Sequence, residues 1–259
     1  MDVDRLLDET CLEHCRWFEV IESTNDAGLV LAENREITLP ALIGADEQTS
    51  GRGRGLNRWW GAQGALMFSI VVDMPSLGLS MNEWPRFSLV TGLAVAETFE
   101  NFLPFATVGV KWPNDVWIDG RKACGILIEQ ADKMSDRLVV GIGMNVNNSF
   151  LNAPEAQRSI AISMSDVANG RRISRTDVLI FFVNHWRSLV RQFADGEFPL
   201  AERWSHACVL SGHPVTLTRG DCETTGICAG IDNDGSLLLR TAFAIERCYA
   251  GTVRLLSPE

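Results

Sequence analysis

The chain has 259 residues, of which 46% are hydrophobic and 22% are charged, as expected for a globular protein. Its formal net charge of −10 disfavours general nucleic-acid binding, because such binding depends on Lys and Arg meeting phosphates. No apolar run approaches the length of a membrane-spanning helix, and the acidic start lacks a signal-peptide core. We therefore expect a cytoplasmic protein with no membrane partner.

The seven cysteines are odd in number and scattered, which indicates reduced thiols rather than a disulfide framework. One cluster, Cys11, His14 and Cys15, has ligand-type residues close together. No second ligand pair follows at a suitable distance, so we expect no metal site.

In chain order, short apolar or alternating runs predict a series of β-strands. These runs lie at residues 16–22, 40–48, 65–73, 108–110, 116–118, 121–130 and 138–147. Apolar residues at helical spacing predict helices at 27–33, 85–102, 162–168 and 174–193. From about Ser211, short alternating segments between Gly-Asp and Asn-Asp-Gly turns predict a small all-β module. We place two domains, at 1–208 and 209–259.

The stretch from Asp46 to Gly64 is the most informative part of the sequence. Three glycines alternate with two arginines, and a third arginine and two tryptophans follow: Gly51, Arg52, Gly53, Arg54, Gly55, Arg58, Trp59 and Trp60. Glycines let main-chain N–H groups approach a ligand, and arginines offer forked donors for phosphate or carboxylate. The alternative is an exposed linker, but the stretch lies between two predicted strands. A basic loop in an acidic protein favours a small anionic ligand, over which a tryptophan can close.

Three other segments carry signals of a site: residues 23–25, Lys111 and the strand predicted at 138–147. Ser23 or Thr24 is a natural N-cap for the helix that follows, and the alternative is that these hydroxyls and Asn25 bind a polar ligand head. Lys111 ends an apolar strand and begins the Lys-Trp-Pro-Asn-Asp block, in which the proline keeps the preceding residue extended. We therefore expect the Lys111 ammonium group to be held in one direction.

The strand predicted at 138–147 contains two interior glycines, Gly141 and Gly143, which indicates that a ligand or another backbone comes close. Asn147 fits a turn with Asn148. Asn145 falls within the strand pattern, so we expect it to have a functional role.

Taken together, these residues resemble the biotin protein ligases over nearly the whole chain. The motifs are four blocks: Glu47-Gln48 before Gly51–Gly55, Lys111–Asp115, Cys124–Glu129 and Gly141–Asn147. The resemblance implies an α+β fold similar to the class II aminoacyl-tRNA synthetases, with a mixed sheet and a C-terminal SH3-like β-barrel. It also implies attachment of biotin to a lysine of a biotin carboxyl carrier protein, with ATP and Mg²⁺.

The same resemblance implies the site residues. Lys111, Arg52 and Arg54 would be catalytic. Residues binding biotin or biotinyl-AMP would be Ser23, Thr24, Asn25, Gln48, Gly51, Arg52, Gly53, Arg54, Trp59, Lys111, Asn114, Gly125, Gly143 and Asn145. The chain departs from many members at Trp60–Gln63, where a Ser-Pro pair is common. Ser23 comes too early to leave room for the winged helix of the repressor-type members, so we expect no DNA binding.

Two other functions remain as alternatives. Lipoate or octanoate ligases share the fold and the adenylate chemistry, but a fatty chain needs no polar partners such as Ser23, Thr24 and Gln48. A non-catalytic biotin sensor would have no need of Lys111 and the arginines.

Overall fold

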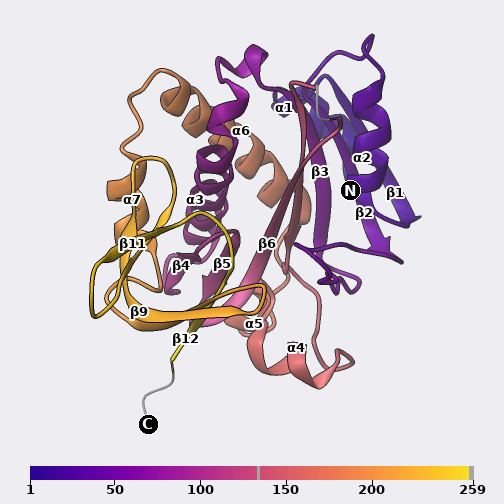
Figure 1. Cartoon of the computed structure of the whole chain (residues 1–259). Coiled ribbons are helices and arrows are strands. Elements are labelled where there is room, and N and C mark those ends of the chain that lie inside the picture. The colour runs from indigo at the N-terminus through magenta and orange to yellow at the C-terminus, as the bar shows by residue number, and fades with distance from the viewer. Residues whose placement is uncertain (133–134, 257–259) are drawn as a thin grey trace.

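The computed structural model describes residues 1–132 and 135–256, and Figure 1 shows its arrangement. A seven-stranded sheet forms its centre, in the order β1-β2-β3-β7-β6-β5-β4. The strands are β1 (His14–Ile21), β2 (Ala41–Gln48), β3 (Leu66–Asp73), β4 (Val108–Lys111), β5 (Asp115–Ile118), β6 (Arg121–Gln130) and β7 (Arg137–Met144). The β1–β2 pair is parallel and the other neighbours are antiparallel, so the sheet is mixed.

Helices cover both faces of this sheet. The long helices α3 (Trp84–Phe102) and α6 (Arg175–Ala194) pack on one face, and α2 (Thr24–Glu33) packs on the other (Figure 1). Shorter helices are α1 (Val3–Glu9), α4 (Glu155–Ile160), α5 (Met164–Val167) and α7 (Leu200–Ala207), with 3-10 turns η1 (Pro75–Leu77) and η2 (Met81–Glu83).

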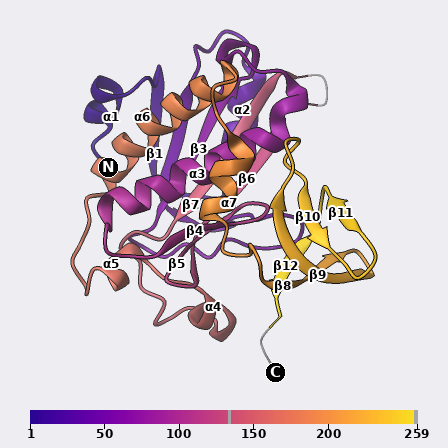
Figure 2. The same ribbon diagram turned by 90° about the vertical axis from the view of Figure 1, so that its left-hand side faces the viewer.

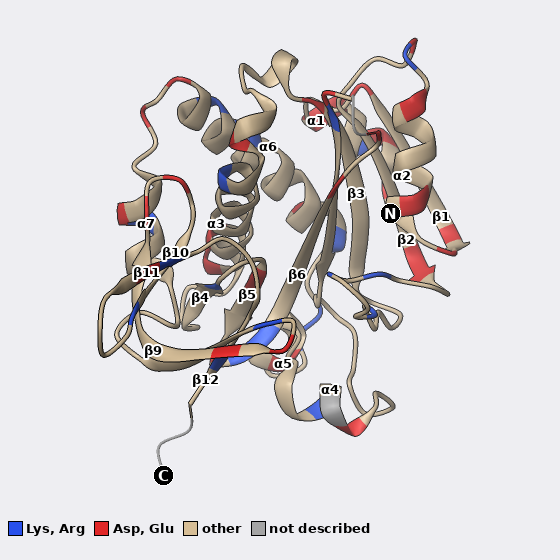
Figure 3. Cartoon of the chain, viewed as in Figure 1, with Lys and Arg blue, Asp and Glu red and all other residues tan. Residues whose placement is uncertain are grey.

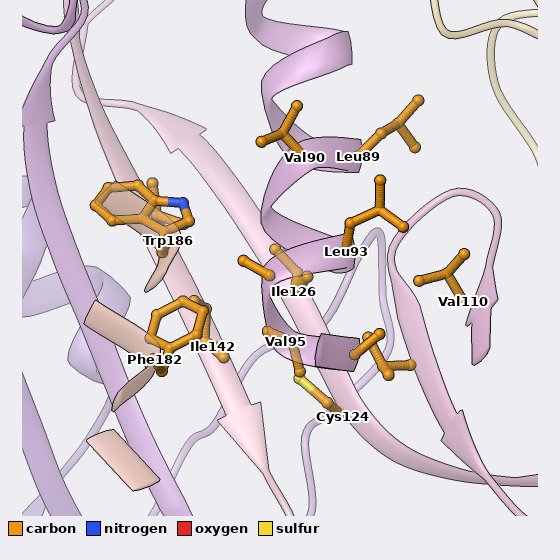
Figure 4. Packing of buried hydrophobic residues seen from close by; sticks show 14 of the residues in the cluster. Leu89, Val90, Leu93, Val95, Val110, Cys124, Ile126, Ile142, Phe182 and Trp186 are labelled. Atoms are coloured by element: carbon orange, nitrogen blue, oxygen red, sulfur yellow. The ribbon is translucent and has the colours of Figure 1, made fainter. Parts of the chain in front are cut away.

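The alternation of side chains along the strands separates the core from the functional face. Phe68 and Ile142 point into the main core, where Figure 4 shows Ile142 and Ile126 near Leu93 of α3 and Phe182 of α6. Residues at the intervening positions point towards α2. Ser69 pairs with Gly141 across β3 and β7, and Gly125 pairs with Gly143 across β6 and β7, so these four residues share the α2 face.

A second, five-stranded antiparallel sheet follows, in the order β11-β10-β9-β8-β12 (Figure 2). Its strands are β8 (Pro214–Arg219), β9 (Cys222–Ile231), β10 (Leu237–Arg240), β11 (Ile245–Cys248) and β12 (Thr252–Leu255). The segment before this sheet and the turn between β9 and β10 are hydrogen-bonded to the end of β4 and the block that follows. Val209 N donates to Val110 O at 3.0 Å, and Trp112 Nε1 donates to Gly235 O at 3.2 Å.

The expected α+β class, with a mixed sheet and a small C-terminal β domain, is confirmed. Ser23 caps α2 as expected, since its Oγ accepts from Asp26 N at 3.3 Å. The strand predicted to continue to residue 147 ends instead at Met144. Beyond it, Asn145 accepts from Asn148 Nδ2 at 3.1 Å, and this local turn replaces the ladder.

The sequence did not predict three helices, α1, α4 and α7. In α1 Leu6 is the one buried residue, and in α7 Leu200 and Trp204 are buried. One or two buried apolar residues in so short a segment are too few to produce a recognisable helical periodicity in the sequence. Within residues 1–132 and 135–256, no helix combines the length and the apolar character needed to cross a membrane.

Candidate active site

A cavity of about 1130 Å³ lies on the α2 face of the main sheet and reaches the C-terminal sheet. It collects residues from segments that are far apart in the sequence. The predicted site residues that line it are Ser23, Thr24, Asn25, Gln48, Arg52, Gly53, Arg54, Trp59, Lys111, Asn114, Gly125, Gly143 and Asn145.

Gly51 is the predicted residue that does not line this cavity. Its carbonyl accepts from Trp59 N at 3.0 Å, and a Cβ there would lie 2.8 Å from Trp59 O. The glycine is therefore needed where the loop folds back on itself, rather than for contact with a ligand.

One end of the cavity is a floor of neutral, hydrogen-bonded groups, of which Thr24, Asn25 and Ser69 are buried and Gln48 is half-buried. Gln48 Oε1 accepts from Thr24 N at 2.8 Å and lies 3.2 Å from Thr24 Oγ1. Ser69 Oγ donates to Asn25 Oδ1 at 2.6 Å and lies 2.9 Å from Thr24 Oγ1. These contacts fix the Thr24 hydroxyl and the Gln48 amide before any ligand arrives. Ser69 was missed because it lies within an otherwise apolar strand.

Both polar atoms of the Asn25 side chain are hydrogen-bonded within the protein. Its Nδ2 donates to Leu127 O at 3.2 Å and to Glu129 Oε2 at 2.8 Å, while its Oδ1 accepts from Ser69. A Cβ on Gly141 would lie 2.0 Å from Asn25 Oδ1. The close approach at Gly141 is therefore made by the Asn25 side chain, and not by the ligand or backbone that was expected. The geometry of Asn25 fits a supporting role in the floor.

Trp59 makes the corresponding close approach at the other glycines. A Cβ on Gly143 would lie 2.4 Å from the indole ring, and one on Gly125 would lie 3.0 Å from it. The Lys122 ammonium lies 5.8 Å from the ring centroid. Trp59 thus lies on the glycine surface of β6 and β7, whereas Trp60 packs against Phe150 with tilted rings whose centroids are 5.5 Å apart.

The other end of the cavity is cationic. The Lys111 ammonium lies 4.7 Å from the centroid of Trp117, and Lys122 Nζ holds the neighbouring Asp115 carboxylate at 2.6 Å. Burial lowers the pKa of Lys111 and the positive charges of Lys122 and Arg254 lower it further, against the opposing effect of Asp115. An anion beside this ammonium would relieve its unfavourable environment.

The chain that forms this cavity matches a known protein family. Residues 17–147 match the family described as the biotin/lipoate A/B protein ligase family. The chain belongs to this family. Residues 210–256 match the biotin protein ligase C terminal domain, so the resemblance seen in the sequence motifs is confirmed.

Individual relatives agree with this membership. The chain is 30% identical to the bifunctional ligase/repressor BirA of Bacillus subtilis, over 94% of this chain and 74% of that protein. It is 28% identical to the biotin--[acetyl-CoA-carboxylase] ligase of Paracoccus denitrificans, over 85% of this chain and 91% of that protein. Among solved structures, it is similar to the biotin protein ligase from Aquifex aeolicus in complex with biotin and ATP, with a TM-score of 0.81 and 26% identity over 95% of this chain and 100% of that chain.

In this family member the C-terminal sheet is part of the cavity wall. Arg54 Nη1 lies 3.4 Å from Asn114 Oδ1 and 3.5 Å from Gly251 O. Residues of the C-terminal sheet and of its connecting turns that line the cavity are Thr218, Arg219, Gly220, Ala250, Gly251, Thr252, Val253 and Arg254. Figure 3 shows basic residues on β12 and at the start of β6, with acidic residues along α2 and β1. Arg219 and Arg254 were missed because nothing in the sequence links them to segments more than a hundred residues earlier.

Proposed function

We propose that the chain uses ATP to activate biotin as biotinyl-5′-AMP and then transfers the biotinyl group to a lysine of a biotin carboxyl carrier domain. The observation that carries this proposal is the division of one cavity into a neutral polar floor and a cationic wall. The Aquifex aeolicus ligase to which the chain is similar is in complex with biotin and ATP.

In the first step, a carboxylate oxygen of biotin attacks the α-phosphorus of ATP and pyrophosphate leaves. Negative charge gathers around phosphorus in the transition state, and fixed cations in a water-poor cavity stabilise that charge. We assign this role to Lys111, Arg52 and Arg54, which all line the cavity. The ureido head of biotin would lie on the floor, against Thr24 and Gln48.

In the second step, the neutral ε-amine of the carrier lysine attacks the acyl carbon of biotinyl-AMP. The bond between this carbon and the phosphate oxygen breaks, AMP leaves and an amide forms. Neither step needs a covalent nucleophile from the enzyme, so the residues of this chain position the reactants and stabilise charge. The loop that carries Arg54 and Trp59 covers the cavity and would shield the mixed anhydride from water.

Magnesium is expected to accompany the triphosphate and to neutralise part of its charge. Among residues 1–132 and 135–256, no group of three or more His, Cys, Asp or Glu side chains is arranged to hold a metal ion. Phosphate oxygens and water are the usual ligands of nucleotide-bound magnesium. We therefore propose that the ion enters with ATP rather than residing in the protein.

Lipoate or octanoate is the second candidate substrate, since the family includes lipoate ligases. The floor favours biotin, because an aliphatic chain would offer no hydrogen bond to the buried Thr24 hydroxyl or to the half-buried Gln48 amide.

The transfer reaction tests the proposal. Purified protein is incubated with biotin, ATP, Mg²⁺ and a carrier fragment, and biotinylation is read on a streptavidin blot. We expect labelling of the carrier that depends on ATP and is lost in Lys111→Ala. A protein that binds biotin by calorimetry yet labels no carrier would instead be a biotin sensor.

A further inference from the structure

Arg52 is held by two carboxylates in the structure, rather than being free to meet an anion. Its Nη1 donates to Glu129 Oε1 at 2.8 Å, and its Nη2 donates to Glu129 Oε2 at 2.6 Å. The same Nη2 lies 2.6 Å from Asp26 Oδ1. The contact with Glu129 is the two-pronged geometry that makes Arg–carboxylate pairs strong and directional. Glu129 is also the main cause of a raised pKa at Arg52.

Both carboxylates are attached to rigid parts of the molecule. Glu129 lies on β6, and its Oε2 also accepts from Asn25 Nδ2 at 2.8 Å, which ties it to the cavity floor. Asp26 lies in the first turn of α2, whose N-cap is Ser23. Arg52, in contrast, belongs to the loop between β2 and β3.

The loop itself folds into a small hairpin that contains Arg52. Gly53 N donates to Asn57 O at 2.8 Å, Trp59 N donates to Gly51 O at 3.0 Å, and Arg52 and Arg58 form a β-bridge. A contact that fixes the Arg52 side chain therefore fixes residues 51–59 over the cavity.

We propose that Glu129, assisted by Asp26, is a positioning residue that latches the 51–59 loop to the cavity wall before a substrate binds. Neither residue was predicted from the sequence to belong to the site. A substrate anion that takes the two-pronged contact with Nη1 and Nη2 of Arg52 has to replace Glu129, so the latch then exchanges a protein carboxylate for a ligand oxygen. The latch itself does not depend on which substrate is bound.

Trypsin provides a direct measure of the latch, because the loop carries its own cleavage sites after Arg54 and Arg58. When opening is fast compared with cleavage, the cleavage rate reports the population of the open loop. Glu129→Gln keeps the size of the side chain and an acceptor for Asn25, but removes the charge that Arg52 contacts. We expect this variant to be cleaved after Arg54 and Arg58 roughly two- to fivefold faster than wild type, as for loss of a partly exposed ion pair. Asp26→Asn should give a smaller increase.

A double-mutant cycle separates the latch from a general loosening of the fold. Arg52→Gln should accelerate cleavage after Arg54 and Arg58 about as much as Glu129→Gln does, and the double variant should be no faster than Arg52→Gln. Asp46→Asn is the matched control, since it removes an ion pair of 2.7 Å to Arg175 that does not involve the loop. This control should leave cleavage in the loop unchanged.

Two results would overturn the latch. One is a cleavage rate in Glu129→Gln equal to that of wild type, with both proteins folded by circular dichroism. The other is an equal acceleration by Glu129→Gln with and without Arg52, which would mean that Glu129 acts through another contact. No substrate is present in these measurements, so their outcome is independent of the carrier-labelling result.

Discussion

The two ends of the cavity differ in how firmly their groups are fixed. At the floor, Thr24 and Asn25 are 4% exposed and Ser69 is fully buried, and each is hydrogen-bonded to a neighbour. Arg52 and Arg54 instead come from the loop between β2 and β3. The Arg52 side chain is 36% exposed and pairs with Glu129 beside the floor. The floor is built from secondary structure, whereas two of the three proposed catalytic cations are carried by a loop.

This difference indicates a division of labour. We expect the neutral floor to discriminate between head groups, because a mismatched ligand leaves buried polar groups without a ligand partner. A loop of cations can open for entry and close for reaction. Lys111 is the exception among these cations, since it lies at the end of β4 and not on the loop.

The largest expected effect is at this fixed cation. Lys111→Ala should slow biotin-dependent ATP–pyrophosphate exchange by ~10²–10³-fold, because it removes a preorganised positive charge at the reacting phosphate. The fold should be intact by circular dichroism. Exchange at the wild-type rate would remove Lys111 from the mechanism.

At the floor we expect a smaller effect that appears in binding. Thr24→Val keeps the shape of the side chain but deletes the hydroxyl that faces Gln48. The KM for biotin in the exchange reaction should rise roughly tenfold with little change in kcat, since a hydrogen bond in both ground and transition states is lost. Thr24→Ser, which keeps the hydroxyl, is the control. A fall in kcat alone would assign Thr24 to the chemical step.

The loop should show its role as a lid. Arg54→Gly removes the side chain that lies near Asn114 and Gly251 O, and with it a contact to the C-terminal sheet. We expect release of biotinyl-AMP to increase several-fold, because one partly buried polar contact is worth about 1 kcal/mol. The readout is labelling of a bystander protein that lacks a carrier domain. If labelling remained confined to the carrier, the lid role of Arg54 would be refuted.

The smallest effect concerns stability and pH. Burial lowers the pKa of Lys111 in the folded protein below 10.5, so between the two pKa values the unfolded chain binds more protons. The contribution of Lys111 to the free energy of unfolding therefore rises with pH across this window. At pH 7 the free energy of unfolding of Lys111→Met should exceed that of wild type by less than about 1 kcal/mol. This difference should shrink as the pH rises towards 10.5. Urea unfolding at several pH values measures it, and a gain that grows with pH would contradict the assigned direction.

The sequence predicts this molecule well where a local pattern carries the information. Strand and helix periodicity, the cap at Ser23 and the glycine-arginine loop are all visible within a few residues. The long helices α3 and α6 show a wide apolar stripe, whereas the short helices α1, α4 and α7 do not.

Contacts between distant segments were not predictable in this way. Nothing near Glu129 indicates that it faces Arg52, and nothing near Arg254 indicates that the C-terminal sheet reaches Lys111. The glycine at Gly143 signalled a close approach, but only the folded chain shows that Trp59 makes it. The expected absence of a nucleic-acid partner stays a prediction.

The most direct test of the divided cavity is ATP–pyrophosphate exchange measured with biotin and, separately, with octanoate as the acyl acid. A polar floor facing a cationic wall predicts exchange with biotin and a value of kcat/KM for octanoate lower by about 100-fold or more. Equal exchange with both acids, or faster exchange with octanoate, would contradict the assignment of the floor to the biotin head group.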